Sequence, residues 1–330
     1  MDADTGLWQV ADIDDATQVG AARRMAARLA EYAGLDDTRA GQLGLVVVEL
    51  ATNLFKHARQ GRLFLRAEGE GDSAVIDVVA VDQGPGMDLE RCFRDGFSTG
   101  GTSGTGLGAV RRVATLFDAY SDARGSVLFA RLGTMPGPRR GSVALAIRGE
   151  LESGDRWQFL PTPRGWSAAV VDGLGHGAEA ARAADIVARE HAALPESPAH
   201  CLALAHERSR AGRGAAASIV AYDAGAASLV HAGVGNVAVS VVGLEDGRGL
   251  ASQNGTLGAA CPAVREQRID APRRSLVVMH SDGLSSRWSI RTHPGLRSRH
   301  PQVIAAALFR DAWRVRDDAT VLVVETGEAA

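Results

Sequence analysis

Two glycine-rich stretches carry residue types and spacing that suit an anionic ligand. Residues 82–87 read DQGPGM, with Gly84 and Gly86, and residues 100–108 read GGTSGTGLG before the helix-like run AVRRVATLF at 109–117. Closely spaced glycines let backbone N–H groups approach an anion without interference from Cβ atoms. The N-terminus of a following helix adds partial positive charge. The pattern predicts a phosphate-binding site, although the second stretch by itself also suits a flexible Gly/Ser loop.

Polar groups also interrupt an apolar, helix-like run upstream. In ELATNLFKHA, Asn53 follows Glu49 by four residues, and Lys56 and His57 follow Asn53 by three and four, so all four can share one helix face. A carboxylate and an amide are costly in an apolar core, so the alternatives are a solvated surface stripe or a functional site. The functional interpretation makes Asn53 an oxygen ligand of Mg²⁺ and Glu49 a general base. It places Lys56, the one lysine of the sequence, and His57 near phosphate.

The elements that position these groups follow from local signals. Asp82 ends the strand-like run AVIDVVAV, so its carboxylate can accept a hydrogen bond from an exocyclic amino group such as that of adenine. Asp36 or Asp37 is a suitable N-cap for the helix that carries Glu49, and Gly34 ends the helix before it. We expect helices at 17–33 and 36–58, and strands at 5–12, 62–68, 74–81 and 125–132.

Three motifs now occur in a recognisable order. ELATN, DQGPGM and GTSGTGLG resemble the N, G1 and G2 boxes of the GHKL ATPase/kinase superfamily, and more specifically its small serine/threonine switch kinases of the RsbT type. The resemblance implies an ATP-binding α/β sandwich that uses Mg²⁺, with a short lid around 98–105. No phosphoaccepting histidine helix precedes the first box, which disfavours a sensor histidine kinase. The implied nucleotide-binding residues are Asn53, Lys56, His57, Asp82, Gly84, Gly86, Gly104, Thr105, Gly106, Leu107 and Gly108.

Carboxylates adjoin apolar strands in the second half of the chain. Asp172 follows AAVV, Asp282 follows SLVVM closely, and the pair Asp317 and Asp318 precedes TVLVV. A single Asp-Gly after a strand is usually a hairpin turn. Together, however, carboxylates that are far apart in sequence but lie at strand ends predict one divalent-metal cluster with oxygen ligands.

These points resemble the PPM metal-dependent protein phosphatases of the SpoIIE branch, including the compact RsbX type. The resemblance rests on SGD at 153–155, VVDGLGHG, HSDGL and RDDATV. It implies an α-β-β-α sandwich that holds two Mn²⁺ or Mg²⁺ ions and hydrolyses phosphoserine or phosphothreonine without a phosphoenzyme. Asp172 would bridge the ions as the catalytic centre. The other implied ligands are Asp155, the carbonyl of Gly173, Asp282, Asp317 and Asp318. We interpret His176 as a cap of the following helix, with leaving-group protonation as the alternative, and His231 as structural.

Composition bounds the remaining possibilities. The chain has 330 residues and a net charge of −3 without a basic block, which excludes a nucleic-acid footprint. It shows no membrane-length apolar run and no secretory signal, so we expect a cytoplasmic protein without a membrane partner. The fold class is α/β (α+β). We expect an ATP-binding Ser/Thr kinase domain at 1–134, a linker at 135–141, a phosphatase domain at 142–326 and a tail at 327–330.

The two halves together predict a bifunctional partner-switching regulator with opposed kinase and phosphatase activities. By resemblance, its substrates would be STAS-domain proteins, with a stressosome scaffold as a further partner. In the alternative, the N-terminal half is an ATP-gated binding module that holds a sigma factor or another regulator, and the phosphatase is the sole catalyst. In a third version, ATP only changes the phosphatase rate.

Overall fold

The computed structural model describes residues 8–92, 106–150, 152–243 and 247–327, and the chain divides into two compact units. The N-terminal unit comprises Trp8–Met135 together with Ser289–Asp311, which we call the inserted segment. The C-terminal unit comprises Pro136–Trp288 and the residues from Ala312 onward. A stretch late in the sequence therefore belongs to the unit formed by the start of the chain.

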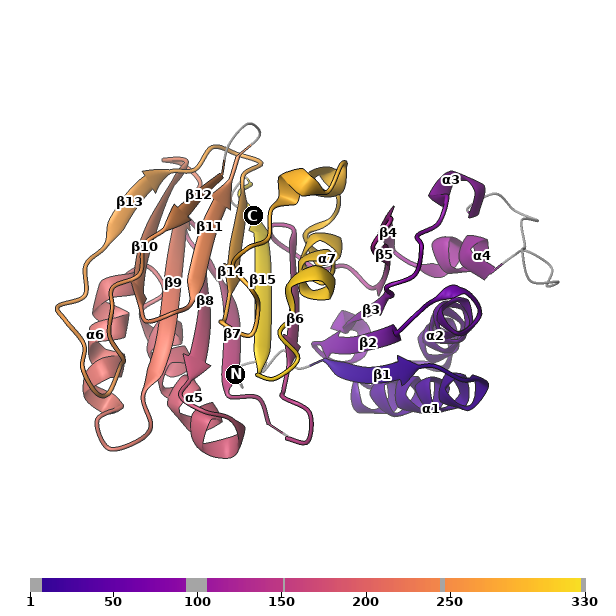
Figure 1. Cartoon of the computed structure of the whole chain (residues 1–330), viewed down its shortest axis with the longest axis horizontal. Helices are drawn as coiled ribbons and strands as arrows, with labels where there is room; N and C mark the ends of the chain where they lie inside the picture. Colours follow the sequence, from indigo (N-terminus) through magenta and orange to yellow (C-terminus); the bar gives the residue numbers. More distant parts are fainter. Residues whose placement is uncertain (1–7, 93–105, 151, 244–246, 328–330) are drawn as a thin grey trace. The chain divides into compact units, whose positions relative to one another are not determined.

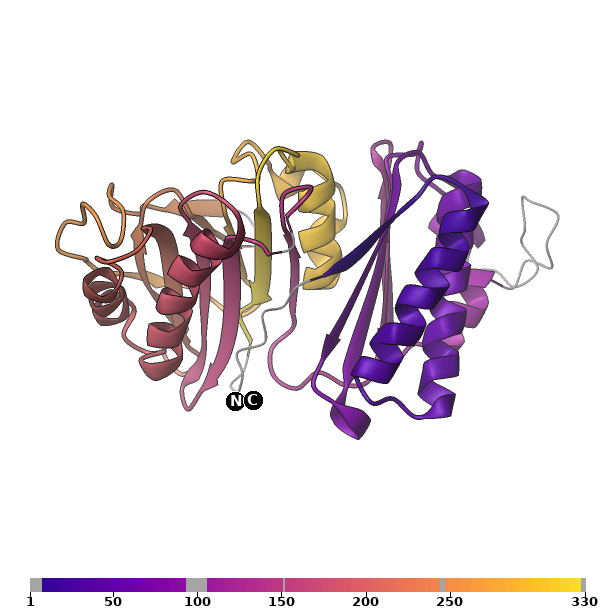
Figure 2. The same ribbon diagram turned by 90° about the horizontal axis from the view of Figure 1, so that it is seen from below.

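The N-terminal unit is built on one antiparallel sheet with the strand order β1-β2-β3-β5-β4. Its strands are β1 (Gln9–Ile13), β2 (Gly61–Glu68), β3 (Val75–Val81), β4 (Leu116–Asp122) and β5 (Gly125–Leu132). Two long helices, α1 (Ala16–Tyr32) and α2 (Asp37–His57), run along one face of it (Figure 2). The shorter helices are α3 (Leu89–Cys92), α4 (Gly106–Val113) and the 3₁₀ turn η1 (Gly71–Ser73).

Local capping explains where the long helices begin. Asp15 caps α1 in a capping box with Gln18, and Asp36 caps α2 by accepting a hydrogen bond from the amide of Arg39 at 2.7 Å. Gly34 adopts a φ of +63° just beyond α1, as expected for a residue that ends a helix. The prediction of Asp36 as a cap is confirmed.

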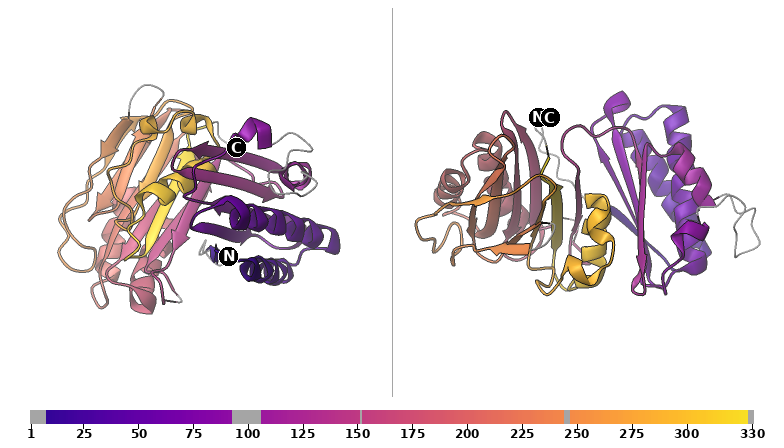
Figure 3. Two further views of the ribbon diagram at one scale, coloured as in Figure 1. Left: turned by 45° about the vertical axis from the view of Figure 1, so that its right-hand side comes forward. Right: turned by 90° about the horizontal axis from the view of Figure 1, so that it is seen from above.

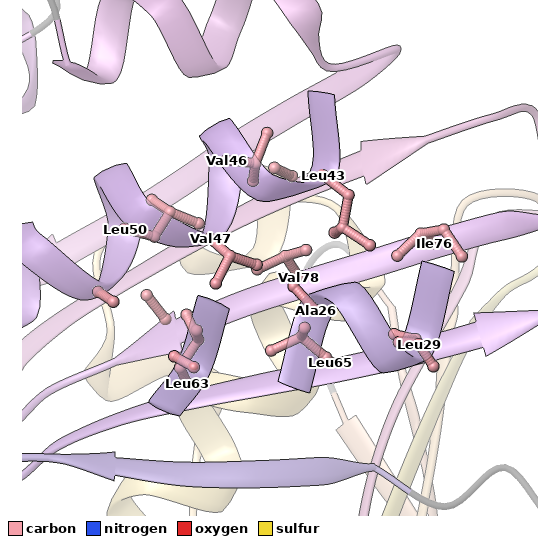
Figure 4. Packing of buried hydrophobic residues seen from close by; sticks show 14 of the residues in the cluster. Ala26, Leu29, Leu43, Val46, Val47, Leu50, Leu63, Leu65, Ile76 and Val78 are labelled. Atoms are coloured by element: carbon pink, nitrogen blue, oxygen red, sulfur yellow. The ribbon is translucent and has the colours of Figure 1, made fainter. Parts of the chain in front are cut away.

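The core of this unit lies between the two helices and the sheet. Alternate residues of β2 and β3 point toward α1 and α2, as the period of a strand requires. Figure 4 shows the packing of ten core residues from these helices and strands: Ala26, Leu29, Leu43, Val46, Val47, Leu50, Leu63, Leu65, Ile76 and Val78.

The helix-like run expected at 109–117 is shorter in the structure. Helix α4 ends at Val113, and β4 begins at Leu116, because the amide of Thr115 already donates to the carbonyl of Arg131 on β5. Strand pairing overrides the helical pattern of the last residues. Strand β4 itself was not predicted.

The inserted segment covers the opposite face of the same sheet, as the right panel of Figure 3 shows. It contains the 3₁₀ turns η2 (Ile290–Thr292) and η3 (Leu296–Ser298) and most of helix α7 (Pro301–Ala312). The rings of Phe64 and Phe309 meet edge to face at 5.9 Å, and those of Phe129 and His300 lie 5.1 Å apart. Since both faces are covered, β3 and β5 are buried along their entire lengths.

A buried ion cluster lies on this covered face. Asp77 on β3, which is 1% exposed, accepts two hydrogen bonds from Arg131 at 2.6 and 2.9 Å and one from Arg66 at 3.2 Å. Although burial raises the pKa of the Asp77 carboxyl, these arginines hold it below its ordinary value. The charge is thus satisfied by partners on the two neighbouring strands.

The C-terminal unit contains two further five-stranded sheets, labelled in Figure 1. The first has the order β13-β10-β9-β8-β7, with α5 (Gly177–Ala193) and α6 (Pro198–Arg208) packed on it. Its strands are β7 (Asp155–Thr162), β8 (Gly165–Gly173), β9 (Ala215–Asp223), β10 (Ser228–Val234) and β13 (Gln267–Asp270). The second sheet has the order β12-β11-β14-β15-β6 and contains β6 (Arg140–Leu145), β11 (Ala238–Val242), β12 (Gly247–Leu250), β14 (Leu276–His280) and β15 (Ala319–Glu325).

The predicted mixed α/β fold class is confirmed in both units. In the C-terminal unit, β15 and β6 of the second sheet contact β7 of the first, which gives a helix-sheet-sheet arrangement. Strand β6 begins at Arg140, inside the stretch expected as a linker.

Candidate functional site

Helix α2 presents the predicted polar face. Glu49 and Asn53 are partly buried on it, and Lys56 and His57 are exposed at its C-terminal end, while Leu50 on the other side is buried in the core. The four polar residues therefore lie on one side of the helix, as their spacing predicted. The structure does not test their roles as base, Mg²⁺ ligand and phosphate contacts.

The first glycine-rich loop packs against the end of this helix. The amide of Gly84 donates to Oδ1 of Asp82 at 2.6 Å, and a Cβ at position 84 would stand 3.4 Å from the carbonyl oxygen of His57. Asp82 is 6% exposed, and burial raises the pKa of its carboxyl above the ordinary value. Hydrogen bonds from the amides of Gly84 and Ser126 and the charge of Arg310 oppose that rise. Asp82 is thus a buried acceptor held in place by its own loop.

The second glycine-rich stretch meets Glu49. Gly106 is the first residue of α4, and a Cβ added there would stand 2.5 Å from Oε2 of Glu49. The carboxylate therefore lies beside the N-terminus of α4, where backbone N–H groups favour negative charge. Leu107 and Gly108 follow on α4, and Leu107 packs partly against the core. Gly104, Thr105 and the expected lid at 98–105 lie outside the described residues.

Two features of this site were not predicted. The β4–β5 hairpin supports the first loop: Gly86 has a φ of +79°, and a Cβ there would overlap the carbonyl oxygen of Asp122. A groove of about 680 Å³ also runs between α1 and α2, from Leu35 near their connection to Arg23 and Glu49. The non-adjacent positions involved left no local signal in the sequence.

The predicted acidic residues of the C-terminal unit are brought together. Asp155 and Asp172 are directly opposite each other on β7 and β8. Asp282 follows β14, and Asp317 and Asp318 precede β15. Because β14 and β15 are antiparallel neighbours, the last residues of β14 and the first residues of β15 lie side by side at the same end of the sheet.

Electrostatics shows how closely the five carboxylates interact. Burial and the charges of Asp155, Asp282, Asp317 and Asp318 raise the pKa of Asp172 to about 8. Burial likewise raises the pKa of Asp155 to about 7, with Asp318 and Asp282 adding to it and a hydrogen bond from Ser281 opposing. Like charges held this close disfavour the ionised forms. The donors are all oxygens, so the set fits a hard divalent cation, which would offset the repulsion.

Neighbouring groups hold several of these carboxylates individually. Oδ2 of Asp155 accepts a hydrogen bond from Ser281 Oγ at 2.6 Å, and Oδ2 of Asp282 accepts one from the side-chain amide of Asn236 at 2.7 Å. Among the described residues, no three His, Cys, Asp or Glu side chains already stand as a metal-ligand group. The predicted ligation therefore stays a prediction.

Asp318 is engaged with the backbone. Its two oxygens accept the amides of Ile147 and Gly154, each at 2.6 Å, and the residue is 3% exposed. These bonds tie three loops at the edge of the acidic cluster together. A role in positioning the loops is therefore visible, and direct metal contact by Asp318 stays a prediction.

Two residues near the cluster refine the sequence analysis. Gly173 is packed so tightly on Ala180 that a Cβ would overlap the carbonyl oxygen of that residue. His176 occupies the N-cap position of α5, but its side chain makes no capping bond and instead pairs with Oε1 of Glu150 at 2.7 Å. The interpretation of His176 as the cap of the following helix is confirmed for its position, while its side chain bonds Glu150 and not the helix amides. His231 is fully buried, in keeping with a structural role.

Comparison with known proteins assigns each half. Residues 14–132 match the histidine kinase-like ATPase domain, and residues 162–327 match Stage II sporulation protein E (SpoIIE). The serine/threonine-protein kinase RsbT of Bacillus subtilis (strain 168) is 31% identical over 104 residues, covering 31% of this chain and 78% of that protein.

Two solved structures, among others, resemble parts of this chain. One, described as the bacterial stressosome, a modular system adapted to control secondary messenger signaling, is 25% identical with a TM-score of 0.54, covering 58% of this chain and 100% of the other. RsbX in complex with magnesium is 18% identical with a TM-score of 0.49, covering 58% and 97%. No helix in the described part of the chain has both the length and the apolar character needed to cross a membrane. The chain belongs to the SpoIIE family through its C-terminal half, and its N-terminal half is a histidine kinase-like ATPase domain related to the RsbT kinase.

Proposed function

We propose that this protein is a bifunctional switch enzyme, with an ATP-dependent serine/threonine kinase in the N-terminal unit and a metal-dependent phosphoserine/phosphothreonine phosphatase in the C-terminal unit. The observation that supports the kinase best is the placement of Glu49 beside the N-terminus of α4. A carboxylate at this point can take the proton of a substrate hydroxyl next to a terminus suited to phosphate. A module that only binds nucleotide has no need of such a base.

In the kinase reaction, bound ATP with Mg²⁺ supplies the phosphoryl group. Asp82 accepts a hydrogen bond from the adenine amino group, since its carboxylate is buried and fixed by the amide of Gly84. Asn53 offers an amide oxygen to Mg²⁺, and Lys56 offers an ammonium to phosphate. Glu49 holds the proton of the attacking hydroxyl, and the groove between α1 and α2 leaves one side of Glu49 accessible.

In the phosphatase reaction, two bound divalent ions, Mn²⁺ or Mg²⁺, would supply Lewis-acid stabilisation of the phosphoryl oxygens. Asp172, Asp282 and Asp317 would hold them, with Asp155 and the carbonyl of Gly173 as further contacts. Ser281 and Asn236 orient two of these carboxylates through the hydrogen bonds described above. His176, exposed and paired with Glu150, is available to give a proton to the departing serine or threonine oxygen, which becomes the free hydroxyl.

The substrates are small STAS-domain regulators in a partner-switching pathway, assembled on a stressosome-like scaffold. The likeness of the first half to a serine/threonine kinase and the likeness of the chain to a structure described as the stressosome support this assignment. Both active units on one chain raise the local concentration of each activity at a shared partner. We place this system in the cytoplasm.

The test compares wild type, Glu49→Gln and Asp172→Asn in a lysate supplied with γ-labelled ATP, Mg²⁺ and Mn²⁺. A small labelled protein should accumulate with Asp172→Asn, lose its label when wild type is added, and stay unlabelled with Glu49→Gln. ATP binding by purified Glu49→Gln must match wild type, since the substitution removes a proton acceptor and keeps the shape. If ATP binds and no protein is labelled by any variant, the ATP-gated binding module replaces the kinase.

A further inference from the structure

The β4–β5 hairpin forms the support of the loop that contains Asp82. The amide of Asp82 donates to the carbonyl of Ser126 at 3.0 Å, and the amide of Met87 donates to Ser121 Oγ at 2.7 Å. Gly125 approaches Asp82 so closely that a Cβ would overlap its carbonyl oxygen. The position of the Asp82 loop is therefore set by the position of the hairpin.

The hairpin, in turn, is held by a charged network from the inserted segment. Oδ1 of Asp122, the last residue of β4, accepts a hydrogen bond from Arg310 Nη2 at 3.1 Å. Oδ2 of Asp122 accepts two from Arg124, at 2.9 and 2.6 Å. Arg124 also donates to the carbonyl of Thr292 at 3.1 Å. Arg310 and Thr292 of the inserted segment thus hold this end of the hairpin from one side.

Arg310 is itself fixed within the inserted segment. Its Nε donates to Oδ1 of Asp311 at 2.6 Å, and Oδ2 of Asp311 pairs with His293 Nε2 at 2.7 Å. The Arg310 side chain is 1% exposed, and that of Asp122 is 17% exposed. Breaking an ion pair shielded from water to this degree costs far more than breaking a surface pair. The same guanidinium is close enough to Asp82 to oppose the rise in the pKa of that carboxyl.

We infer that Arg310, which the chain supplies from the stretch between Asp282 and Asp317, is a positioning residue of the nucleotide site. It fixes Asp122, and through the hairpin it fixes the buried carboxylate that selects adenine. This inference rests on the proposed nucleotide site. The inserted segment then supports the ATP-binding unit. In the sequence, it also lies between Asp282 and Asp317, two of the carboxylates predicted to bind metal.

The ratio of ATP affinity to GTP affinity separates a positioning role from general destabilisation, because destabilisation lowers both affinities alike. Adenine presents an amino donor to Asp82, whereas guanine presents a carbonyl acceptor at the equivalent position. A displaced Asp82 should therefore weaken ATP binding and change GTP binding little. Arg299→Ala is the matched control, because Arg299 pairs with Asp118 at 3.4 Å on the same strand and is also supplied by the inserted segment.

The experiment measures binding of ATP and of GTP, each with Mg²⁺, to the full chain by titration calorimetry. Arg310→Ala should lower ATP affinity about tenfold, the factor that corresponds to 1.4 kcal/mol, while GTP affinity and the Arg299→Ala variant stay near wild type. Asp122→Ala removes the same contact from the other side and should reproduce the loss. It keeps the test decisive if Arg310→Ala unfolds.

Two results would overturn the inference while leaving the nucleotide site intact. One is an Asp122→Ala variant, or a folded Arg310→Ala variant, that binds ATP as wild type does. The other is that ATP affinity and GTP affinity fall by the same factor in Arg310→Ala, and that Arg299→Ala shows the same fall. A wild-type protein that binds neither nucleotide would instead refute the proposed function, and the inference with it.

Discussion

Gly106 and Glu49 touch across the α2–α4 contact so closely that a Cβ on residue 106 would stand 2.5 Å from the Glu49 carboxylate. The glycine that begins α4 and the candidate general base are therefore a matched pair. Either residue constrains the other, since any side chain at position 106 must push the carboxylate or the helix away.

Gly106→Ala should therefore impair phosphotransfer. A shift of the carboxylate by about 1 Å is enough to reduce the rate about a hundredfold. The control is Gly41→Ala, because Gly41 lies on α2 with nothing within 4 Å of an added Cβ and should tolerate alanine. The rate of label transfer from ATP to the substrate protein is the measurement. Equal rates for both variants would contradict the pairing.

Asp77→Ala should destabilise the N-terminal unit by about 3–5 kcal/mol, because it leaves the buried Arg66 and Arg131 without their shared partner. Asp12→Ala removes an exposed ion pair with Arg62 and should cost less than about 1 kcal/mol. Hydrogen–deuterium exchange of the β2 and β3 amides in the full chain reports on this unit directly. Exchange rates that rise equally in the two variants would count against a stabilising cluster.

Asn236→Ala should weaken metal binding. Asn236 orients Asp282 through a 2.7 Å hydrogen bond, and loss of such a supporting bond lowers metal affinity about 10- to 100-fold. Mn²⁺ titration calorimetry on the full chain is the measurement, with the exposed Asn254 changed to Ala as the control. An unchanged Mn²⁺ affinity in Asn236→Ala would remove Asp282 from the predicted ligand set or show that it needs no support.

The C-terminal unit should lose stability in acid because of His191. Burial lowers the pKa of this histidine to about 3 from an ordinary value of 6.5, and its ring is held between Ser167 Oγ and Gln158 Oε1. Below pH 6.5 the unfolded chain takes up a proton that the folded chain refuses. The contribution of His191 to the free energy of unfolding is therefore fully present above pH 6.5. It falls between pH 6.5 and 3 by about 1.4 kcal/mol for each pH unit.

Urea unfolding at pH 7 and pH 5 checks this expectation. His191→Gln should lose less stability between the two pH values than wild type, whatever its stability at pH 7. His200→Gln, at an exposed position, should keep the wild-type difference. If the free energy of unfolding fell by the same amount from pH 7 to pH 5 in all three proteins, His191 would be excluded as the cause of the acid sensitivity.

The sequence alone predicted several local elements of the N-terminal unit, although not β4, and it named the residues expected at both sites. A capping signal places the start of α2, because the Asp36 side chain bonds to an amide only a few residues away. The i, i+4 spacing of Glu49 and Asn53 determines their shared face for the same reason. The carboxylates at strand ends were also readable, because Asp172, Asp282 and Asp317 each follow or precede an unmistakably apolar strand.

The tertiary structure alone decided which distant residues meet. The continuous apolar runs of β3 and β5 indicate that both faces of the sheet are covered, but they do not say by what. The cover is the inserted segment, and its contacts, such as that of Arg310 with Asp122, join residues 188 positions apart. Such pairings depend on ring packing and buried charge between separate elements, which no local pattern in the chain encodes.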